Sequence, residues 1–253
     1  MKTLFVGQNC IYLSTIHSTN SYAIELLKET KLPEGTLIYT FEQLNGRGQR
    51  GNTWHGEPTK NGAFSYIFYP SFLQADEQFL LTQVTSLAVA DLMAELLQST
   101  DKMQEIRIKW PNDIYVGNQK IAGILIENSL RDKNLQHAVI GIGININQTS
   151  FSNQFNATSL ALITKKELDL KGVMNRLCDF MEARYLQLKT NKQAMLINAY
   201  LERLYRLDEW HWYQTGESRF EGKIKGVSSI GKLEVELRSG EQVSFNLKEI
   251  QFL

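Results

Sequence analysis

The chain has 253 residues, and 27 Lys and Arg balance 27 Asp and Glu, so the formal net charge is +0 at pH 7. A neutral chain argues against a broad electrostatic surface for nucleic acid or anionic lipid. The two cysteines, Cys10 and Cys178, are too few for a disulfide framework. The histidines form no HxxxH pair, which disfavours zinc, and no uninterrupted apolar run is long enough to span a membrane. We therefore expect a cytoplasmic globular protein.

Hydrophobic periodicity and turn residues divide the chain into helices and strands. The elements expected in chain order are a helix over 18–35, strands over 35–43 and 61–70, an amphipathic helix over 78–99, a strand over 106–110, a β-hairpin over 113–127, a strand over 137–147 and helices from about 168 to 204. The hairpin is expected because Gly117 and Asn118 lie between two alternating apolar runs. From Trp210 the chain changes to short strands with glycine turns, which predict a small β-barrel. We expect two domains, 1–208 and 209–253.

The segment 45–56 combines glycines with arginines, and suits neither a helix nor a strand. Gly46, Gly48 and Gly51 would allow backbone amides to point at one anion, and Arg47 and Arg50 could hold that anion from two sides. The alternative is a flexible surface loop with solvated arginines. The spacing matches neither the phosphate-binding loop of ATPases nor the dinucleotide-binding glycine motif.

The predicted hairpin brings polar residues together. Lys109, Asp113 and Lys120 should lie close to one another, although a simple Asx turn would also explain the Pro-Asn-Asp sequence. Lys120 stands in an otherwise apolar run, where it needs an anionic partner. Gly123 in the same strand indicates close approach of a flat ligand. Trp54 would either stack on a purine or cap the core.

Four motifs occur in order: Ser-Thr-Asn at 18–20, QLNGRGQRGNTW at 43–54, KWPND at 109–113 and KIAGIL at 120–125. Together they resemble the catalytic domain of biotin–protein ligases, and the segment after Trp210 is similar to the small SH3-like barrel of that family. The resemblance implies an α/β fold, with a mixed sheet backed by helices as in class II aminoacyl-tRNA synthetases.

The resemblance also implies the reaction. Biotin and ATP, with Mg²⁺, would give biotinyl-5′-adenylate, and biotin would then pass to a lysine of a biotin carboxyl carrier protein domain. DNA binding is not expected, because the helix at 18–35 begins too early for a preceding helix-turn-helix domain. Many relatives dimerise through a sheet edge, and the sequence leaves a homodimer open.

Residue roles follow from the same resemblance. The catalytic residues would be Lys120, Arg47 and Asp113. Biotin would be bound by Ser18, Thr19, Asn20, Gln43, Gly46, Arg47, Gly48, Gln49, Lys120 and Gly123. ATP and the adenylate would be bound by Arg50, Trp54, Asn112 and Asn145. No protein residue is assigned to the metal. Relatives often carry arginine where this chain has Gln49, so one charge-assisted contact is absent.

The glycine-arginine segment 45–56 is expected to close over the adenylate, to exclude water, and to be disordered without ligand. Two other functions remain open. One is a lipoate or octanoate ligase or transferase, which shares the core architecture and also modifies a lysine. The other is a non-enzymatic biotin sensor, which would not need Lys120 and Arg47.

Overall fold

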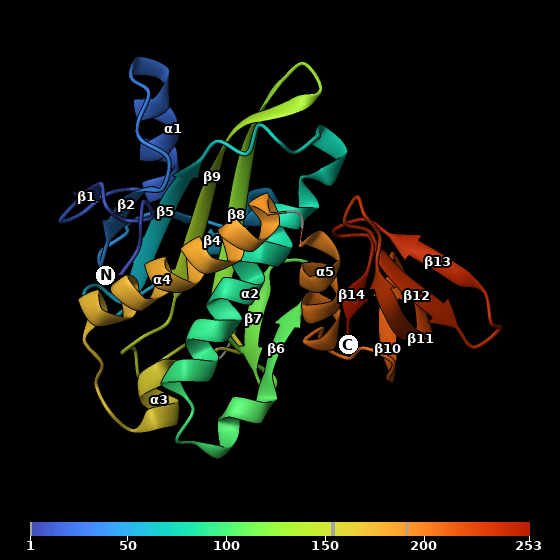
Figure 1. Cartoon of the computed structure of the whole chain (residues 1–253). Coiled ribbons are helices and arrows are strands. Elements are labelled where there is room, and N and C mark those ends of the chain that lie inside the picture. Colours follow the sequence, from blue (N-terminus) through green and yellow to red (C-terminus); the bar gives the residue numbers. More distant parts are fainter. Residues whose placement is uncertain (1, 153–154, 191) are drawn as a thin grey trace.

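The computed structural model describes residues 2–152, 155–190 and 192–253, with the exception of the Arg50 side chain. It confirms the mixed α/β class (Figure 1). The helices are α1 (Thr19–Glu29), α2 (Phe79–Leu96), α3 (Leu160–Thr164), α4 (Leu170–Lys189) and α5 (Gln193–Glu202). The strands are β1 (Cys10–Tyr12), β2 (Thr36–Thr40), β3 (Gly46–Arg47), β4 (Thr53–Trp54), β5 (Gly62–Phe68), β6 (Ile106–Lys109), β7 (Asp113–Val116), β8 (Gln119–Arg131), β9 (Asn134–Ile144), β10 (Trp210–Thr215), β11 (Ser218–Val227), β12 (Leu233–Leu237), β13 (Gln242–Phe245) and β14 (Gln251–Phe252).

Seven strands form the main sheet in the order β1-β2-β5-β9-β8-β7-β6. The pair β1–β2 is parallel, and the other neighbouring strands are antiparallel. Alternation along β5 decides what each face carries: Phe64 and Tyr66 point into the larger core, whereas Ser65 and Ile67 point to the opposite face. The sheet therefore has one mainly apolar face and one face that carries buried polar groups such as Ser65.

The helices are divided between these faces. The long helices α2 and α4 lie side by side across the apolar face, and α5 packs against α2 (Figure 1). Helix α1 packs on the opposite face, over β2, β5 and β9. Its first residues are fixed by Ser18, whose hydroxyl accepts the backbone N–H of Ser21 at 3.4 Å. This cap sets the start of α1 directly above the polar side chains of the sheet.

Helix α2 differs from the prediction of an amphipathic helix, because it is buried on most of its circumference. The sheet covers one side of it, and α4 and α5 cover much of the other. The segment Ala75–Leu96 has the length and hydropathy of a membrane span, but most of it is buried inside the protein. It is therefore a core helix. Its largely buried Asp91 forms ion pairs with Arg184 and Arg203 of the neighbouring helical layer.

Strands β10 to β14 form a separate antiparallel sheet in the order β13-β12-β11-β10-β14, beginning at Trp210 as predicted. Its apolar side chains, including Tyr213 and Ile224, join the main hydrophobic core. The Trp110 indole N–H donates to the Gly231 carbonyl at 3.0 Å and so links the two sheets. A boundary between 208 and 209 stays a prediction.

The segment 45–56 is more regular than predicted. β3 and β4 pair as a short antiparallel ladder, which we call the arginine hairpin (residues 46–54), with a single 3₁₀ turn between the two strands. The Gly48 N–H donates to the Asn52 carbonyl at 2.7 Å, and Gly51 takes a φ of 86° that favours glycine. Because Gly48 uses its amide inside the hairpin, the three glycine amides do not converge on a common point. Disorder of this segment without ligand stays a prediction.

Candidate active site

One pocket, of about 200 Å³, lies between the arginine hairpin, the start of α1 and the β7–β8–β9 part of the sheet. It collects most of the residues that the motifs single out. Those lining it are Ser18, Thr19, Asn20, Gln43, Arg47, Gly48, Gln49, Trp54, Asn112, Asp113, Lys120 and Gly123. Gly46 lies just behind this lining, where a side chain would collide with the Trp54 backbone. The Arg50 side chain lies outside the described part of the structure.

Neutral polar groups form one end of the pocket. Thr19 donates to Gln43 Oε1 from its backbone N–H at 2.9 Å and from its hydroxyl at 3.2 Å. Asn20 Nδ2 donates to the Leu125 carbonyl at 3.2 Å, and Ser65 donates to Asn20 Oδ1 at 2.6 Å. These side chains are at most part-exposed, and their hydrogen bonds fix the donors and acceptors that face the pocket. This end suits a neutral ligand head group with both donors and acceptors.

Two glycines of β9 make room for protein side chains. A Cβ on Gly141 would collide with the Asn20 amide, and one on Gly143 would collide with the Trp54 indole. A Cβ on Gly123 would come within 3.2 Å of Lys120 Nζ and of the same indole. The Trp54 indole therefore packs directly against the sheet, next to Gly123 and Gly143. The close approach expected at Gly123 is made here by Trp54 and Lys120.

An ion pair marks the other end of the pocket. Lys120 Nζ lies 2.7 Å from Asp113 Oδ1, as the predicted hairpin requires. Lys109 of β6 lies opposite Asp113 in the strand register, but its amine packs over the rings of Tyr115 and Phe252 at 4.9 Å each. Burial lowers the pKa of Lys109 below its usual value, and Asp113 partly opposes that shift. Lys120 and Asp113 thus face the pocket, whereas Lys109 does not line it.

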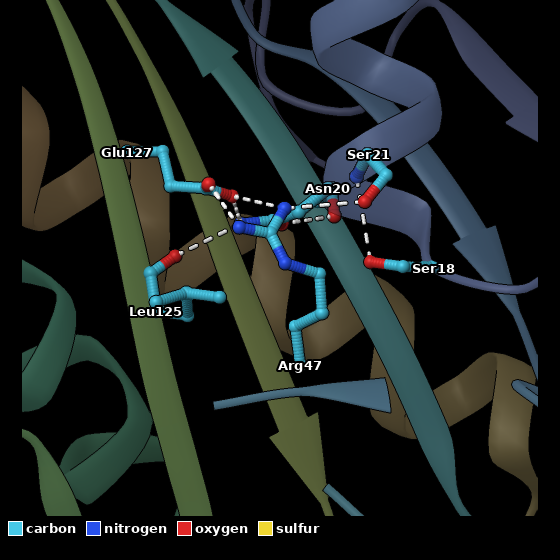
Figure 2. A network of polar contacts seen from close by, with 7 residues as sticks. Ser18, Asn20, Ser21, Arg47, Leu125 and Glu127 are labelled. Carbon is cyan, nitrogen blue, oxygen red and sulfur yellow. Dashed lines mark hydrogen bonds and ion pairs between the residues drawn. The ribbon is translucent and has the colours of Figure 1, made fainter. Parts of the chain in front are cut away.

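Arg47 makes a contact that the sequence did not reveal. Its guanidinium donates to Glu127 Oε1 at 2.7 Å and to the Ser21 hydroxyl at 3.1 Å (Figure 2). Glu127 also accepts from Asn20 Nδ2 at 3.0 Å. The only signal for Glu127 in the sequence is its spacing, since it lies on the same face of β8 as Gly123 and Leu125. Arg47 therefore lies at the neutral end of the pocket, paired with Glu127, while Lys120 is paired with Asp113.

Two buried asparagines hydrogen-bond to backbone carbonyls near the pocket. Asn112 is buried and donates to the Ile124 carbonyl, which ties the turn after Pro111 to β8. Asn145 is buried behind the pocket, where its Nδ2 donates to the Thr158 carbonyl at 3.0 Å. Its Oδ1 has no hydrogen-bond partner among the described residues, and the same holds for Gln49 Oε1. A buried unpaired acceptor is costly, and Gln49 lines the pocket, so its oxygen is suited to a donor on a ligand.

The C-terminal sheet also reaches the pocket. Leu247 and Lys248, which follow β13, are among its lining residues. Lys248 adopts a φ of 73°, a conformation that is uncommon for a residue other than glycine. Nothing in the local sequence indicates that this turn meets the pocket, because the contact depends on how the two sheets pack.

The mixed sheet carries one pocket with a neutral polar end at Thr19 and Gln43 and a cationic end, where Lys120 pairs with Asp113. A sequence profile described as the biotin/lipoate A/B protein ligase family matches residues 12–145. The chain belongs to this family.

Individual relatives give the same assignment. The chain is 31% identical to the bifunctional ligase/repressor BirA of Bacillus spizizenii, over 95% of this chain and 73% of that protein. It is 27% identical to the biotin–[acetyl-CoA-carboxylase] ligase of Paracoccus denitrificans, over 91% of this chain and 95% of that protein. Among solved structures, the biotin protein ligase of Aquifex aeolicus in complex with biotin and ATP superimposes with a TM-score of 0.78 at 26% identity. That match covers 97% of this chain and 99% of the Aquifex chain.

Proposed function

We propose that the protein is a biotin–protein ligase that activates biotin with ATP and transfers it to one lysine of a biotin carboxyl carrier protein domain. The observation that carries the proposal is a single pocket with a neutral hydrogen-bonding end at Thr19 and Gln43 and a cationic end at Lys120. Biotin has the matching form, with a neutral ureido ring at one end and a carboxylate at the other.

Each end of the pocket would hold one end of biotin. The ureido ring would hydrogen-bond to Ser18, Thr19, Asn20 and Gln43, whose positions are fixed by bonds among themselves and to the sheet. Gly46, Gly48 and Gly123 would leave room for the ring and chain. The carboxylate would reach Lys120, and Arg47 would join it once its side chain has left Glu127.

The nucleotide would bind beside the carboxylate end. Trp54 would pack on adenine, which requires the indole to move away from its present contact with Gly143. The unpaired oxygens of Asn145 and Gln49 would accept hydrogen bonds, and Asn112 would keep the Pro111 turn in place. Arg50 would contact the phosphates.

The first step brings two anions together, since the biotin carboxylate attacks the α-phosphate of ATP and pyrophosphate leaves. Lys120 would stabilise the charge that develops on the phosphoryl oxygens. Mg²⁺ commonly binds nucleotide phosphates with only one or two protein carboxylates. The described residues include no group of three or more His, Cys, Asp or Glu that could hold a metal. A metal carried mainly by the nucleotide fits this donor set.

In the second step the acceptor amine attacks the carbonyl of the adenylate and AMP leaves. A lysine amine, with a pKa of about 10.4, is mostly protonated at neutral pH. Asp113 would orient this amine and assist its deprotonation. The carboxylate becomes available when Lys120 turns from Asp113 to the phosphoryl oxygens.

We propose ligation alone, without DNA repression, because the net charge of +0 offers no broad basic surface. The two free cysteines support a cytoplasmic location. A homodimer stays open, since β1 and β6 are both edge strands of the main sheet.

A thermal-shift comparison of ligands tests the substrate. Biotin should raise the melting temperature, whereas lipoate and octanoate at the same concentration should not, because only a ligand of the folded state stabilises it. Stabilisation by lipoate instead would assign the protein to the other branch of the family. The absence of any shift with biotin and ATP together would overturn the proposal.

A further inference from the structure

Glu127 connects three elements at the neutral end of the pocket (Figure 2). It lies in β8, accepts from Asn20 at the start of α1 at 3.0 Å, and pairs with Arg47 of the arginine hairpin at 2.7 and 3.3 Å. Lys120 Nζ lies beside Gly123, four residues along β8, which places it on the order of 13 Å away at about 3.3 Å per residue. The guanidinium that should meet the substrate carboxylate is therefore held by a carboxylate of the protein.

Arg47 can leave its ion pair with Glu127 at little cost in stability. The side chains of Arg47 and Glu127 are 46% and 24% exposed, and an ion pair of that exposure contributes little to stability. Glu127 keeps its hydrogen bond from Asn20 when Arg47 departs, so the carboxylate is not left without a partner. Glu127 occupies the Nη1–Nη2 edge of the Arg47 guanidinium, and a ligand carboxylate beside Lys120 would lie too far from Glu127 for Arg47 to contact both. A substrate carboxylate and Glu127 consequently compete for Arg47.

We propose that Glu127 is a positioning residue that holds Arg47, and with it the arginine hairpin, away from the cationic end of the pocket until an anionic substrate takes its place. This inference rests on the proposed function only for the identity of the anion, the carboxylate of biotin. The contact by which Glu127 holds the arginine hairpin does not depend on that function. Neutralising Glu127 should free Arg47 for the substrate and loosen the hairpin in the ligand-free protein.

The first test uses calorimetric binding of biotin and of biotinamide, in which a neutral amide replaces the carboxylate. Glu127→Gln keeps an oxygen for Asn20 and removes the charge. Glu25→Gln is the matched control, because among the described residues Glu25 forms its ion pair with the exposed Lys28 on α1. We expect E127Q to bind biotin up to about five-fold more tightly and biotinamide as the wild type does. E25Q should change neither, and Arg47→Gln in the E127Q background should abolish the gain.

Weaker biotin binding by E127Q, or an equal change for both ligands, would overturn the proposal, since Glu127 would then only support Asn20. A second test needs no substrate. Trypsin should cut within residues 46–54 faster in ligand-free E127Q than in the wild type or E25Q, and an unchanged rate would also overturn the proposal. If the wild type binds neither biotin nor biotinamide, the proposed function fails, and the trypsin rates alone decide whether Glu127 holds the hairpin.

Discussion

Lys120 and Asp113 form an ion pair across the β7–β8 hairpin, with Nζ 2.7 Å from Oδ1 and both side chains about a quarter to a third exposed. Both residues line the pocket, and Lys120 Nζ lies next to Gly123. Each partner neutralises the other until a ligand charge intervenes. The same two residues can therefore serve the two proposed steps in turn, Lys120 with the phosphoryl group and Asp113 with the acceptor amine.

Lys120→Met should slow adenylate formation by about 10²- to 10³-fold, because it removes a charge that stabilises the transition state while keeping most of the side-chain volume. The measurement is biotin-dependent release of pyrophosphate. Lys102→Met is the control, since Lys102 is partly exposed, does not line the pocket and pairs with Glu105 within the same 3₁₀ turn. A K120M rate equal to the wild-type rate would remove Lys120 from the chemistry.

Asp113→Asn should slow transfer more than activation. The amide cannot accept the proton of the acceptor amine, so we expect about 10²-fold slower transfer from preformed biotinyl-adenylate. Single-turnover transfer to a carrier domain measures this step, and pyrophosphate release measures the first. Equal losses in both steps would instead mean that Asp113 acts only by holding Lys120.

Gly141→Ala should weaken biotin binding by about ten-fold or more, because the new methyl group overlaps the Asn20 amide and such overpacking costs about 1–3 kcal/mol. Gly226→Ala is the control, because the nearest atom to its Cβ would be Glu234 Oε2 at an ordinary 3.4 Å. Calorimetry on both variants measures the difference. Unchanged affinity in G141A would show that Asn20 does not need its present position.

Cys178 should resist alkylation in the folded protein. Burial raises its pKa to about 12, so at pH 8 only about one thiol in 10⁴ is ionised, whereas Cys10 is exposed. Iodoacetamide should label Cys10 first, as peptide mass mapping can show. Rapid labelling of both cysteines at pH 8 would contradict the burial.

The same pKa shift makes the stability of the fold depend on pH. The raised pKa of Cys178 favours the folded state below pH 9, and this contribution is lost as the pH rises toward 12.

The local sequence was sufficient to predict the positions of site residues where a single turn or helix cap determines the backbone. Gly117 and Asn118 predict the hairpin, and that hairpin alone brings Lys120 to Asp113. The capped start of α1 at Ser18 is equally local. In each case, turn or cap chemistry within a few residues fixes the backbone, so the side-chain positions follow.

Contacts between distant segments were not predictable in the same way. Arg47 and Glu127 are far apart in the sequence, and both could have been solvated charges. Leu247 and Lys248 reach the pocket only because the two sheets pack together. The local sequence of β9 does not reveal that Asn20 and Trp54 pack against Gly141 and Gly143. The burial of α2 likewise depends on α4 and α5, which the helix's own sequence does not encode.

The most direct measurement is transfer of radiolabelled biotin to a purified biotin carboxyl carrier domain with ATP and Mg²⁺, run beside lipoate and beside the Lys120→Ala variant. We predict covalent labelling with biotin, no labelling with lipoate, and loss of labelling in K120A. Labelling with lipoate but not biotin, or full biotin transfer by K120A, would contradict the account of this pocket.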